Sequence, residues 1–294
     1  MKHAYMIMAH NQVDLLKTLL KALDYEDNDI VVHIDAKSDI DAKDLKKCVN
    51  KTTIYFTDRK SITWGGYSQI DADIRLLKMA TSLGNHCYYH LLTGVDLPIK
   101  PIQEINLFFE ENQGKEFINY SEKSECIKKY GQRVKYNHYF REKCGRSKNF
   151  YTVLNKSCIL LQKILHFTQN NIKEDSFYFG SAFWDITEDL AQLVLDNEEY
   201  IRDTYKYSSC CDEVFLHTLV WNSEYRNKLF KMQLGNGMEG NMRWIDMERG
   251  ENASPYVIKE DAIEEIVESG MLFARKFDME KYPEAVDRWK QLIK

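Results

Sequence analysis

At residues 4–11 the chain has the sequence AYMIMAHN, a compact apolar run that ends in the polar pair His10-Asn11. Such a run is typical of a buried β-strand. Leucines at helical spacing follow at positions 15, 16, 19, 20 and 23, and the run IVVHID at residues 30–35 then predicts a second strand that ends at Asp35. The order strand, helix, strand indicates α/β architecture with crossover helices.

The same alternation continues through the first half of the chain. Residues 53–56 predict a third strand, apolar residues at positions 70, 74 and 77 predict a helix, and residues 86–92 predict a fourth strand. In open α/β sheets, ligands bind beyond the carboxyl ends of the strands, which is where His10, Asp35 and the turn TGVDLPI at residues 93–99 are expected. A strand-terminal aspartate is also a common turn former, so both interpretations of Asp35 stay open.

Composition limits the class of protein and its partners. With 294 residues and 44% hydrophobic content, the chain is long enough for one large α/β domain or two small ones. The formal net charge of -5 argues against nucleic acid as the main partner. Seven scattered cysteines without a CxxC pair suggest neither a disulfide framework nor a zinc site, and they favour a reducing cytosol. The apolar runs are too short to span a membrane.

Two Asp-x-Asp pairs were considered as metal ligands, because such carboxylates commonly hold a divalent cation against a diphosphate. Asp71 and Asp73 fall within a predicted helix, where residues two apart project to nearly opposite sides. Asp39 and Asp41 fall at the predicted start of another helix, where the dipole favours acidic residues. We therefore expect a metal-independent protein in which cations elsewhere replace the metal.

The middle of the chain has a different character. Residues 123–156 are rich in Lys, Arg, Tyr and Phe and poor in acids. They predict either a solvated, partly helical insertion or a surface that binds an acceptor or an anionic membrane. The apolar run at residues 158–165 is too short to span a bilayer, and we expect it to form a packed helix.

The sequence SCCDEVFL at residues 209–216 carries the best candidate for chemistry. Ser209 with Asp212 resembles a capping box that starts a helix, which places Glu213 in the first turn. There the helix dipole favours the ionised carboxylate that a general base requires. The alternative is an acidic residue that only decorates a helix N-terminus.

Further candidates lie on either side of this sequence. Gly180 would let the backbone approach a ligand, and Ser181 offers a hydroxyl. Residues 241–246 predict an edge strand, and residues 269–278 close the globular part. Arg243 and Lys276, one in each of these segments, are the candidates for the missing counter-charge.

Taken together and in order, these motifs resemble the core-2/I-branching β-1,6-N-acetylglucosaminyltransferase and peptide O-xylosyltransferase family. The resemblance covers most of the chain and rests on these segments: the first strand with His10, HIDAKS at residues 33–38, Trp64 with Gly65-Gly66, LTGVDLPIK at residues 92–100, GSAFW at residues 180–184, Asp212-Glu213, and LFARKFD at residues 272–278. It implies a single GT-A-like α/β domain, residues 1–294, with a Rossmann-like nucleotide-binding half and a mixed central sheet. Within it we expect a nucleotide-sugar half (residues 1–120), a basic insertion (121–176), and a catalytic and diphosphate-binding half (177–294).

The resemblance also implies an inverting, metal-independent transfer of N-acetylglucosamine or xylose from a UDP-sugar to a hydroxyl of a glycan or glycolipid, with no cofactor. Glu213 is then the catalytic base. The implied donor nucleotide-binding residues are Met8, His10, Asp35 and Arg59. The implied diphosphate-binding residues are Arg243 and Lys276. The residues implied for the donor sugar or the acceptor are Trp64, Asp96, Gly180, Ser181 and Trp184.

The departures from the family pattern suggest a bacterial-type member that is cytoplasmic or peripheral on the inner face of the cell membrane. Two rival functions stay open: a non-catalytic glycan-binding protein on the same fold, and a sugar nucleotidyltransferase. The chain has no glycine-rich, lysine-containing phosphate loop near its N-terminus, which counts against the second.

Overall fold

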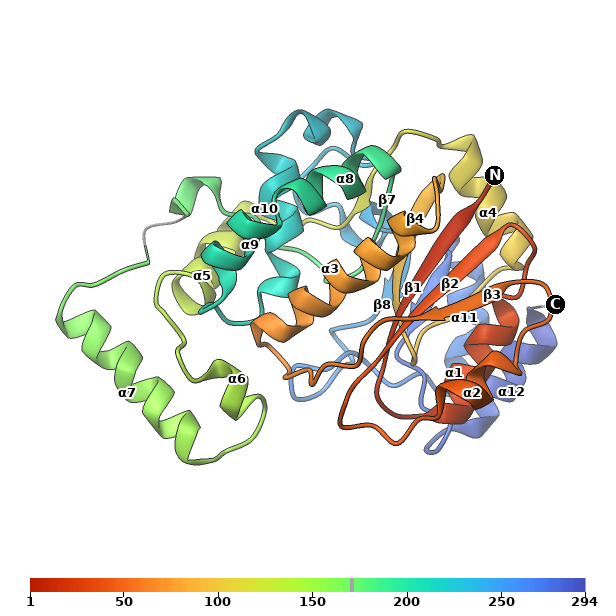
Figure 1. Cartoon of the computed structure of the whole chain (residues 1–294), viewed down its shortest axis with the longest axis horizontal. Coiled ribbons are helices and arrows are strands. Elements are labelled where there is room, and N and C mark those ends of the chain that lie inside the picture. The colour runs from red at the N-terminus through yellow and green to blue at the C-terminus, as the bar shows by residue number, and fades with distance from the viewer. Residues whose placement is uncertain (170–171, 294) are drawn as a thin grey trace.

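A computed structural model describes residues 1–169 and 172–293 and has the predicted α/β architecture (Figure 1). The larger sheet has the strand order β3 (Thr53–Phe56), β2 (Asn28–Ile34), β1 (His3–Ala9), β4 (Tyr88–Thr93), β7 (Trp184–Ile186) and β6 (Phe117–Ile118). Strand β1 pairs in parallel with β2 and β4, whereas β7 is antiparallel to both β4 and β6. The four strands predicted in the first half, the Rossmann-like half and the mixed central sheet of a GT-A-like fold are therefore confirmed.

Strand β1 lies at the centre of the sheet and is covered on both faces. Ala4 and Met6 belong to one hydrophobic core, and Tyr5 and Ile7 to the other. A parallel strand that is buried on both faces needs a nearly continuous apolar sequence, which is what the run AYMIMA provides. The two cores are the reason why this run decides the architecture.

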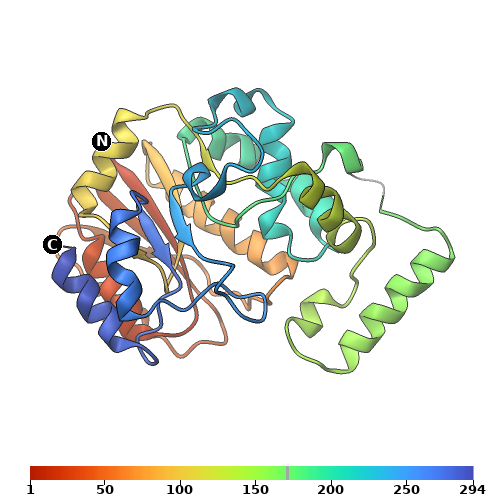
Figure 2. The ribbon, with the colours of Figure 1, turned by 180° about the vertical axis from the view of Figure 1, so that it is seen from behind.

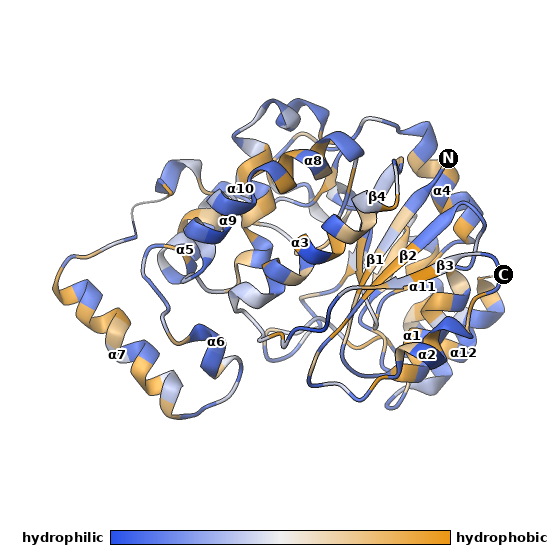
Figure 3. Ribbon diagram, viewed as in Figure 1, coloured by the Kyte–Doolittle hydropathy of each residue, from blue (hydrophilic) through white to orange (hydrophobic). Residues whose placement is uncertain are grey.

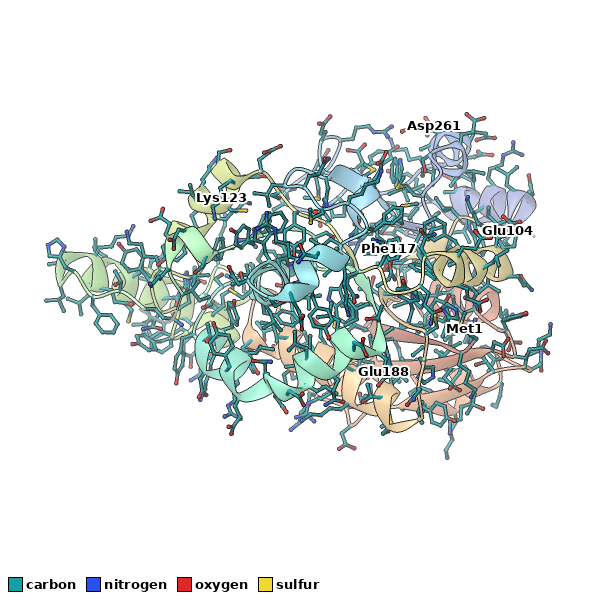
Figure 4. The ribbon with its side chains drawn as sticks, turned by 90° about the horizontal axis from the view of Figure 1, so that it is seen from above. Met1, Glu104, Phe117, Lys123, Glu188 and Asp261 are labelled. Carbon is teal, nitrogen blue, oxygen red and sulfur yellow. The ribbon has the colours of Figure 1, made fainter. Side chains whose placement is uncertain are left out.

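Two groups of helices cover the two faces. The core that contains Tyr5 takes side chains from α1 (Val13–Ala22), α2 (Ala42–Lys46), α4 (Ile102–Glu111), α11 (Ile263–Glu268) and α12 (Pro283–Leu292). The core that contains Met6 takes side chains from α3 (Tyr67–Ser82), α5 (Lys123–Arg133), α8 (Glu188–Asp196), α9 (Glu198–Tyr205) and α10 (Phe215–Trp221). Phe117 of β6 packs against Phe109 and Phe230, with ring centroids 4.9 and 4.6 Å away, and Figure 4 shows it within the body of the molecule.

A second, smaller sheet joins the end of the chain to the carboxyl end of β4. Its order is β5 (Leu97–Pro98), β9 (Phe273–Arg275) and β8 (Arg243–Ile245), so β8 is an edge strand, as predicted. Figure 2 shows these strands from behind. The amide of Phe277 donates to the carbonyl of Val95 at 3.0 Å. This sheet thereby brings the segment after β9 to the ligand side of the larger sheet.

The basic segment forms α5, α6 (Arg141–Cys144) and α7 (Phe150–Ile164). Residues 170 and 171 of the expected insertion lie outside the described residues. The expectation of a packed helix at residues 158–165 is wrong: the helix exists, but Leu160 and Leu161 are more than half exposed. Figures 1 and 2 show α7 set apart from the layers around the sheet. In the described part of the chain, no helix has both the length and the apolar character needed to cross a bilayer.

Short 3-10 turns complete the structure: Glu174–Ser176, Cys211–Glu213, Glu224–Lys228, Gly237–Gly240 and Glu260–Ala262. The seven cysteines are free thiols, as their scattered positions predict.

Candidate active site

Polar residues gather where the parallel strands end. The amide of Asp35, just after β2, donates to the carbonyl of Ala9 at the end of β1, at 2.9 Å. His10 follows Ala9, and the charges of Asp35 and Lys276 both act on its imidazole. Burial is the largest effect and lowers the pKa of His10. Met8, one residue before the end of β1, is partly buried.

Asp35 and Arg59 mainly stabilise a loop. The Asp35 carboxylate accepts from the amides of Lys37 at 2.8 Å and Ile62 at 3.3 Å, and the residue is only 6% exposed. These are turn-forming contacts, as one of the two sequence interpretations expected. The Arg59 guanidinium donates to the carbonyls of Asp35, at 3.1 Å, and Ser38. In this structure, the side chains of Asp35 and Arg59 therefore bond to main-chain atoms. The sequence analysis expected both to bind the nucleotide.

Trp64 lies between the basic segment and the catalytic candidate. Its side chain is 41% exposed, and the guanidinium groups of Arg146 and Arg141 lie 4.2 and 5.0 Å from the ring centroid. The carbonyl of Gly65 accepts from the amide of Cys210 at 2.8 Å. The Trp64 loop is therefore fixed beside the segment that carries Glu213.

The local structure around Glu213 differs from the sequence prediction. Cys210 adopts the left-handed backbone conformation, with φ of 52°, and residues Cys211–Glu213 form a 3-10 turn. Helix α10 begins only at Phe215, and the Ser209 side chain does not cap it. The predicted capping box is wrong because the backbone turns at Cys210, whose amide bonds to Gly65 instead of entering a helix.

The carboxylate of Glu213 is stabilised by an arginine. It forms an ion pair with Arg133 of α5, and its side chain is 33% exposed. Arg133 also donates to the carbonyl of Cys210 at 2.9 Å and stacks over Phe179 at 4.7 Å, so its position is fixed by several contacts. From the sequence alone, Arg133 is expected only as part of a basic surface. Nothing in the local pattern around it indicates the ion pair with Glu213, which lies eighty residues further along the chain.

A second carboxylate adjoins Glu213. Asp212 is buried and accepts a hydrogen bond from the Gln69 amide at 3.1 Å. Burial, and then the charge of Glu213, raise the pKa of Asp212. The two neighbouring carboxyl groups thus differ in environment: one is enclosed, and the other is accessible and paired with Arg133.

Gly180 is required by close packing. Its amide donates to the carbonyl of Glu213 at 3.1 Å, and a Cβ atom there would lie 1.9 Å from the carbonyl oxygen of Asn119. Ser181 is partly exposed, and its amide donates to the Asn119 side chain at 3.0 Å. Trp184, in contrast, is 1% exposed within β7. The expectation that Trp184 contacts a sugar is therefore wrong, because its indole is part of the core.

Two cations, Arg275 and Lys276, follow one another at the end of β9. The Nε atom of Arg275 lies 3.6 Å from the carboxylate of Asp96, and its guanidinium stacks on Phe183 at 4.0 Å. The charge of Glu213 also acts on Arg275. Burial, then the charge of Arg275, and further the charge of Arg146, lower the pKa of Lys276, the next residue. The arrangement of like charges around Lys276 favours the binding of an anion.

Arg243 lies behind this site. Its side chain is 3% exposed, and its Nη2 atom is 2.5 Å from the carboxylate of Asp185, which is fully buried. The same carboxylate is 2.8 Å from Nδ1 of His90. The ion pair engages one nitrogen of the guanidinium, whereas Nε and Nη1 are buried without a hydrogen-bond partner among the described residues, so the role of Arg243 at a diphosphate stays a prediction. Arg275, which the sequence analysis quoted within a motif but did not single out, lies nearer the surface.

The two Asp-x-Asp pairs have the positions that the sequence predicts. Asp71 bonds to Arg75 at 2.7 Å on α3, while Asp73 is buried on the same helix. Asp41 caps α2 by accepting from the amide of Lys43 at 2.8 Å. Across residues 1–169 and 172–293, no group of three or more His, Cys, Asp or Glu side chains could hold a metal ion.

On this α/β fold, the accessible Glu213 carboxylate and the nearby cations form an arrangement that would suit an anionic ligand. The model of the Core-2/I-branching enzyme family matches residues 3–268. The chain belongs to this family.

Curated relatives resemble the chain at low sequence identity. The N-acetyllactosaminide beta-1,6-N-acetylglucosaminyl-transferase of Homo sapiens is 26% identical over 97% of this chain and 70% of its own length. Xylosyltransferase sqv-6 of Caenorhabditis briggsae is 23% identical over 94% of this chain and 34% of its own length. The chain thus spans about a third of the length of that xylosyltransferase.

Among solved structures, the apo form of mouse xyloside xylosyltransferase 1 covers 92% of this chain at 10% identity, with a TM-score of 0.41 and 97% of its own chain covered. The structure of residues 1–349 of S. aureus TarS covers 49% of this chain at 12% identity, with a TM-score of 0.30 and 44% of its own chain covered.

Replacing Arg243 by methionine tests its structural role. We expect Arg243→Met to lower the free energy of unfolding by about 3–5 kcal/mol, because the buried Asp185 would lose its arginine partner and keep only His90. Urea denaturation measures this change, with the exposed Arg202→Met as the matched control. The folded variant should keep its affinity for UDP within about threefold of the wild type. The loss of a hydrogen bond to a charged ligand would weaken binding by more than this factor. Unchanged stability with lost UDP affinity would instead restore a direct role for Arg243.

Proposed function

We propose that the protein is an inverting, metal-independent glycosyltransferase that moves a sugar from a UDP-sugar to a hydroxyl of a glycan or glycolipid acceptor. The observation that carries this proposal is the accessible Glu213 carboxylate, whose charge acts on Arg275, the residue directly before Lys276. The names of the relatives favour N-acetylglucosamine or xylose as the transferred sugar.

In this mechanism Glu213 is the general base. It takes the proton of the acceptor hydroxyl as that oxygen attacks the anomeric carbon. The bond from the anomeric carbon to UDP breaks on the opposite side, so the configuration inverts. Arg133 holds the carboxylate in place through an ion pair.

The leaving group receives its counter-charge from protein side chains. Negative charge develops on the departing diphosphate, and Lys276 with Arg275 would stabilise it, the work that a metal ion does in other enzymes. His10, Met8 and Asp35 lie at the neighbouring strand ends and would border the uridine. The exposed ring of Trp64, with Ser181, would border the donor sugar or the acceptor. Asp96 is buried and bonded to Thr93, and it would act by holding Arg275 in place.

One observation favours the glycan-binding rival. The Glu213 carboxylate already pairs with Arg133, so one of its oxygens is engaged by a guanidinium rather than open to an acceptor hydroxyl. On this alternative, the same site would bind a sugar nucleotide or a glycan without turnover. Measurements of turnover separate the two functions.

We expect release of UDP from at least one UDP-sugar in a panel to continue in excess EDTA. The physical reason is that Lys276 and Arg275 replace the metal at the diphosphate. The measurement is UDP release for each donor, with and without EDTA, in the presence and absence of glycan acceptors. Strict dependence on added metal would refute the cationic mechanism, and silence across the panel would favour the binding rival.

We expect Glu213→Gln to lower kcat by roughly a hundredfold or more, since general bases contribute about 10²–10⁴-fold. UDP affinity should stay near that of the wild type, because the side chain acts on the acceptor. Steady-state kinetics and calorimetry measure the two quantities. Glu239→Gln, which removes the charge of an exposed glutamate paired with Lys231, is the matched control. Full turnover in Glu213→Gln would remove this residue from the mechanism.

As the pH is raised, we expect the affinity for UDP to fall at a lower pH than it would if Lys276 had the pKa of an ordinary lysine. The diphosphate binds the protonated ammonium, and burial with the neighbouring cations lowers the pKa of Lys276, so affinity is lost as the pH rises through that lowered pKa. Calorimetric titration with UDP across alkaline pH measures the effect.

Two substitutions complete this test. Lys276→Arg should move the loss of affinity to higher pH, because a guanidinium stays protonated. Lys276→Met should weaken UDP binding by roughly tenfold or more at neutral pH, as expected for one charge-assisted hydrogen bond. An identical pH profile in wild type and Lys276→Arg would show that another group titrates.

A further inference from the structure

Helix α7 presents its polar side to the protein. The residues of α7 that are buried are Asn155 and Gln162, seven positions apart and therefore on one face of the helix. The Gln162 amide accepts from the backbone N–H of Asn137 and donates to its carbonyl, both at 2.9 Å. Asn155 accepts from the amide of Phe140 at 3.2 Å. These polar contacts fix which side of α7 faces outward.

The outward side of α7 is apolar. Val153, Leu160, Leu161 and Ile164 are between 55 and 63% exposed and share the face opposite to Asn155 and Gln162. Phe150, at the start of the helix, is 70% exposed. Figure 3 shows the hydrophobic colour along α7, and Figures 1, 2 and 4 show the helix at one end of the molecule, apart from the sheet. We call this stripe of five side chains the α7 apolar face.

Positive charge surrounds the α7 apolar face. Between positions 143 and 169 the sequence has five Lys or Arg residues and no Asp or Glu. Lys156 and Lys163 are both exposed and again seven positions apart, so they line one flank of the stripe. The remaining cations are Lys143, Arg146 and Lys148.

We propose that α7 docks in the plane of an anionic lipid bilayer, with its apolar face among the acyl chains and its cations at the phosphates. Helices with an aliphatic face flanked by lysines bind in this way, and anionic lipid adds to the attraction. A second copy of the chain would bring two groups of like charges together. A glycan would offer hydroxyl groups to a face made mostly of aliphatic side chains. The charge and the apolar face together therefore fit anionic lipid. This inference does not depend on the proposed transferase activity.

Vesicle co-sedimentation of the full chain tests the apolar contribution. Phosphatidylcholine vesicles with about a third phosphatidylglycerol are compared with phosphatidylcholine alone, and we expect at least roughly tenfold tighter binding to the anionic vesicles. The triple variant Leu160→Ser, Leu161→Ser, Ile164→Ser should lose roughly tenfold or more of the binding, because the burial of apolar surface is removed. The matched control is Leu107→Ser on α4, where a leucine is also 53% exposed.

The charge contribution is tested separately. Lys156→Gln with Lys163→Gln should weaken binding to the anionic vesicles by roughly tenfold or more and leave binding to neutral vesicles unchanged. Raised salt should have the same effect on the wild type. Because the substituted side chains are exposed, all variants should unfold at wild-type urea concentrations, which checks that they are folded.

Four results would overturn the proposal. They are no binding of the wild type to anionic vesicles, equal binding to both kinds of vesicle, full binding by the triple serine variant, and a dimer in light scattering that the triple variant abolishes. The last result would assign the α7 apolar face to a second copy of the chain. Capture of an acidic protein by a chain that does not bind vesicles would assign it to a protein partner.

Discussion

The fully buried carboxylate of Asp185 is the constraint on which the arrangement of the two sheets depends. A charge in the interior must be paired, and here the partners come from two other strands: His90 of β4 and Arg243 of β8. Asp185 itself lies in β7, so a single carboxylate ties the mixed end of the larger sheet to the smaller one. The network continues from His90 to His3 at 3.0 Å, and burial lowers the pKa of both imidazoles. At least one nitrogen of the cation at position 243 is therefore used for the structure.

Sequence patterns predicted β1, β2 and β4 because these strands have six or seven residues and are almost entirely buried. The short strands β5, β6 and β7 have two or three residues each, too few to show a period. The turn before Glu213 was predicted wrongly because the conformation of Cys210 follows from a hydrogen bond to Gly65, far away in the sequence. Likewise, the sequence around Trp184 and Arg243 is compatible both with side chains that contact a ligand and with side chains that pack in the core. Only their burial distinguishes the two, and burial is a property of the whole fold.

The basic segment (residues 123–156) and Glu213 show no connection in the sequence, but they lie in one region of the structure. Arg133 of α5 pairs with Glu213, and Arg141 of α6 donates to the carbonyls of Trp64 and Gly65, each at 3.2 Å. The first of these arginines sets the electrostatic environment of the carboxylate, and the second holds the loop beside it. Composition revealed an excess of positive charge, but it could not show that two of these charges point inward.

The way in which α7 is attached has a consequence for how this family member can change over time. Asn155 and Gln162 bind main-chain atoms of residues 137 and 140, and every amino acid except proline supplies such donors and acceptors alike. The loop beneath the helix can therefore accept many substitutions while its main-chain atoms still form these hydrogen bonds to α7. The outward face contributes no packing to either core, so selection on folding does not fix its residues. The helix can thus evolve to suit different cellular surfaces while the two sheets stay as they are.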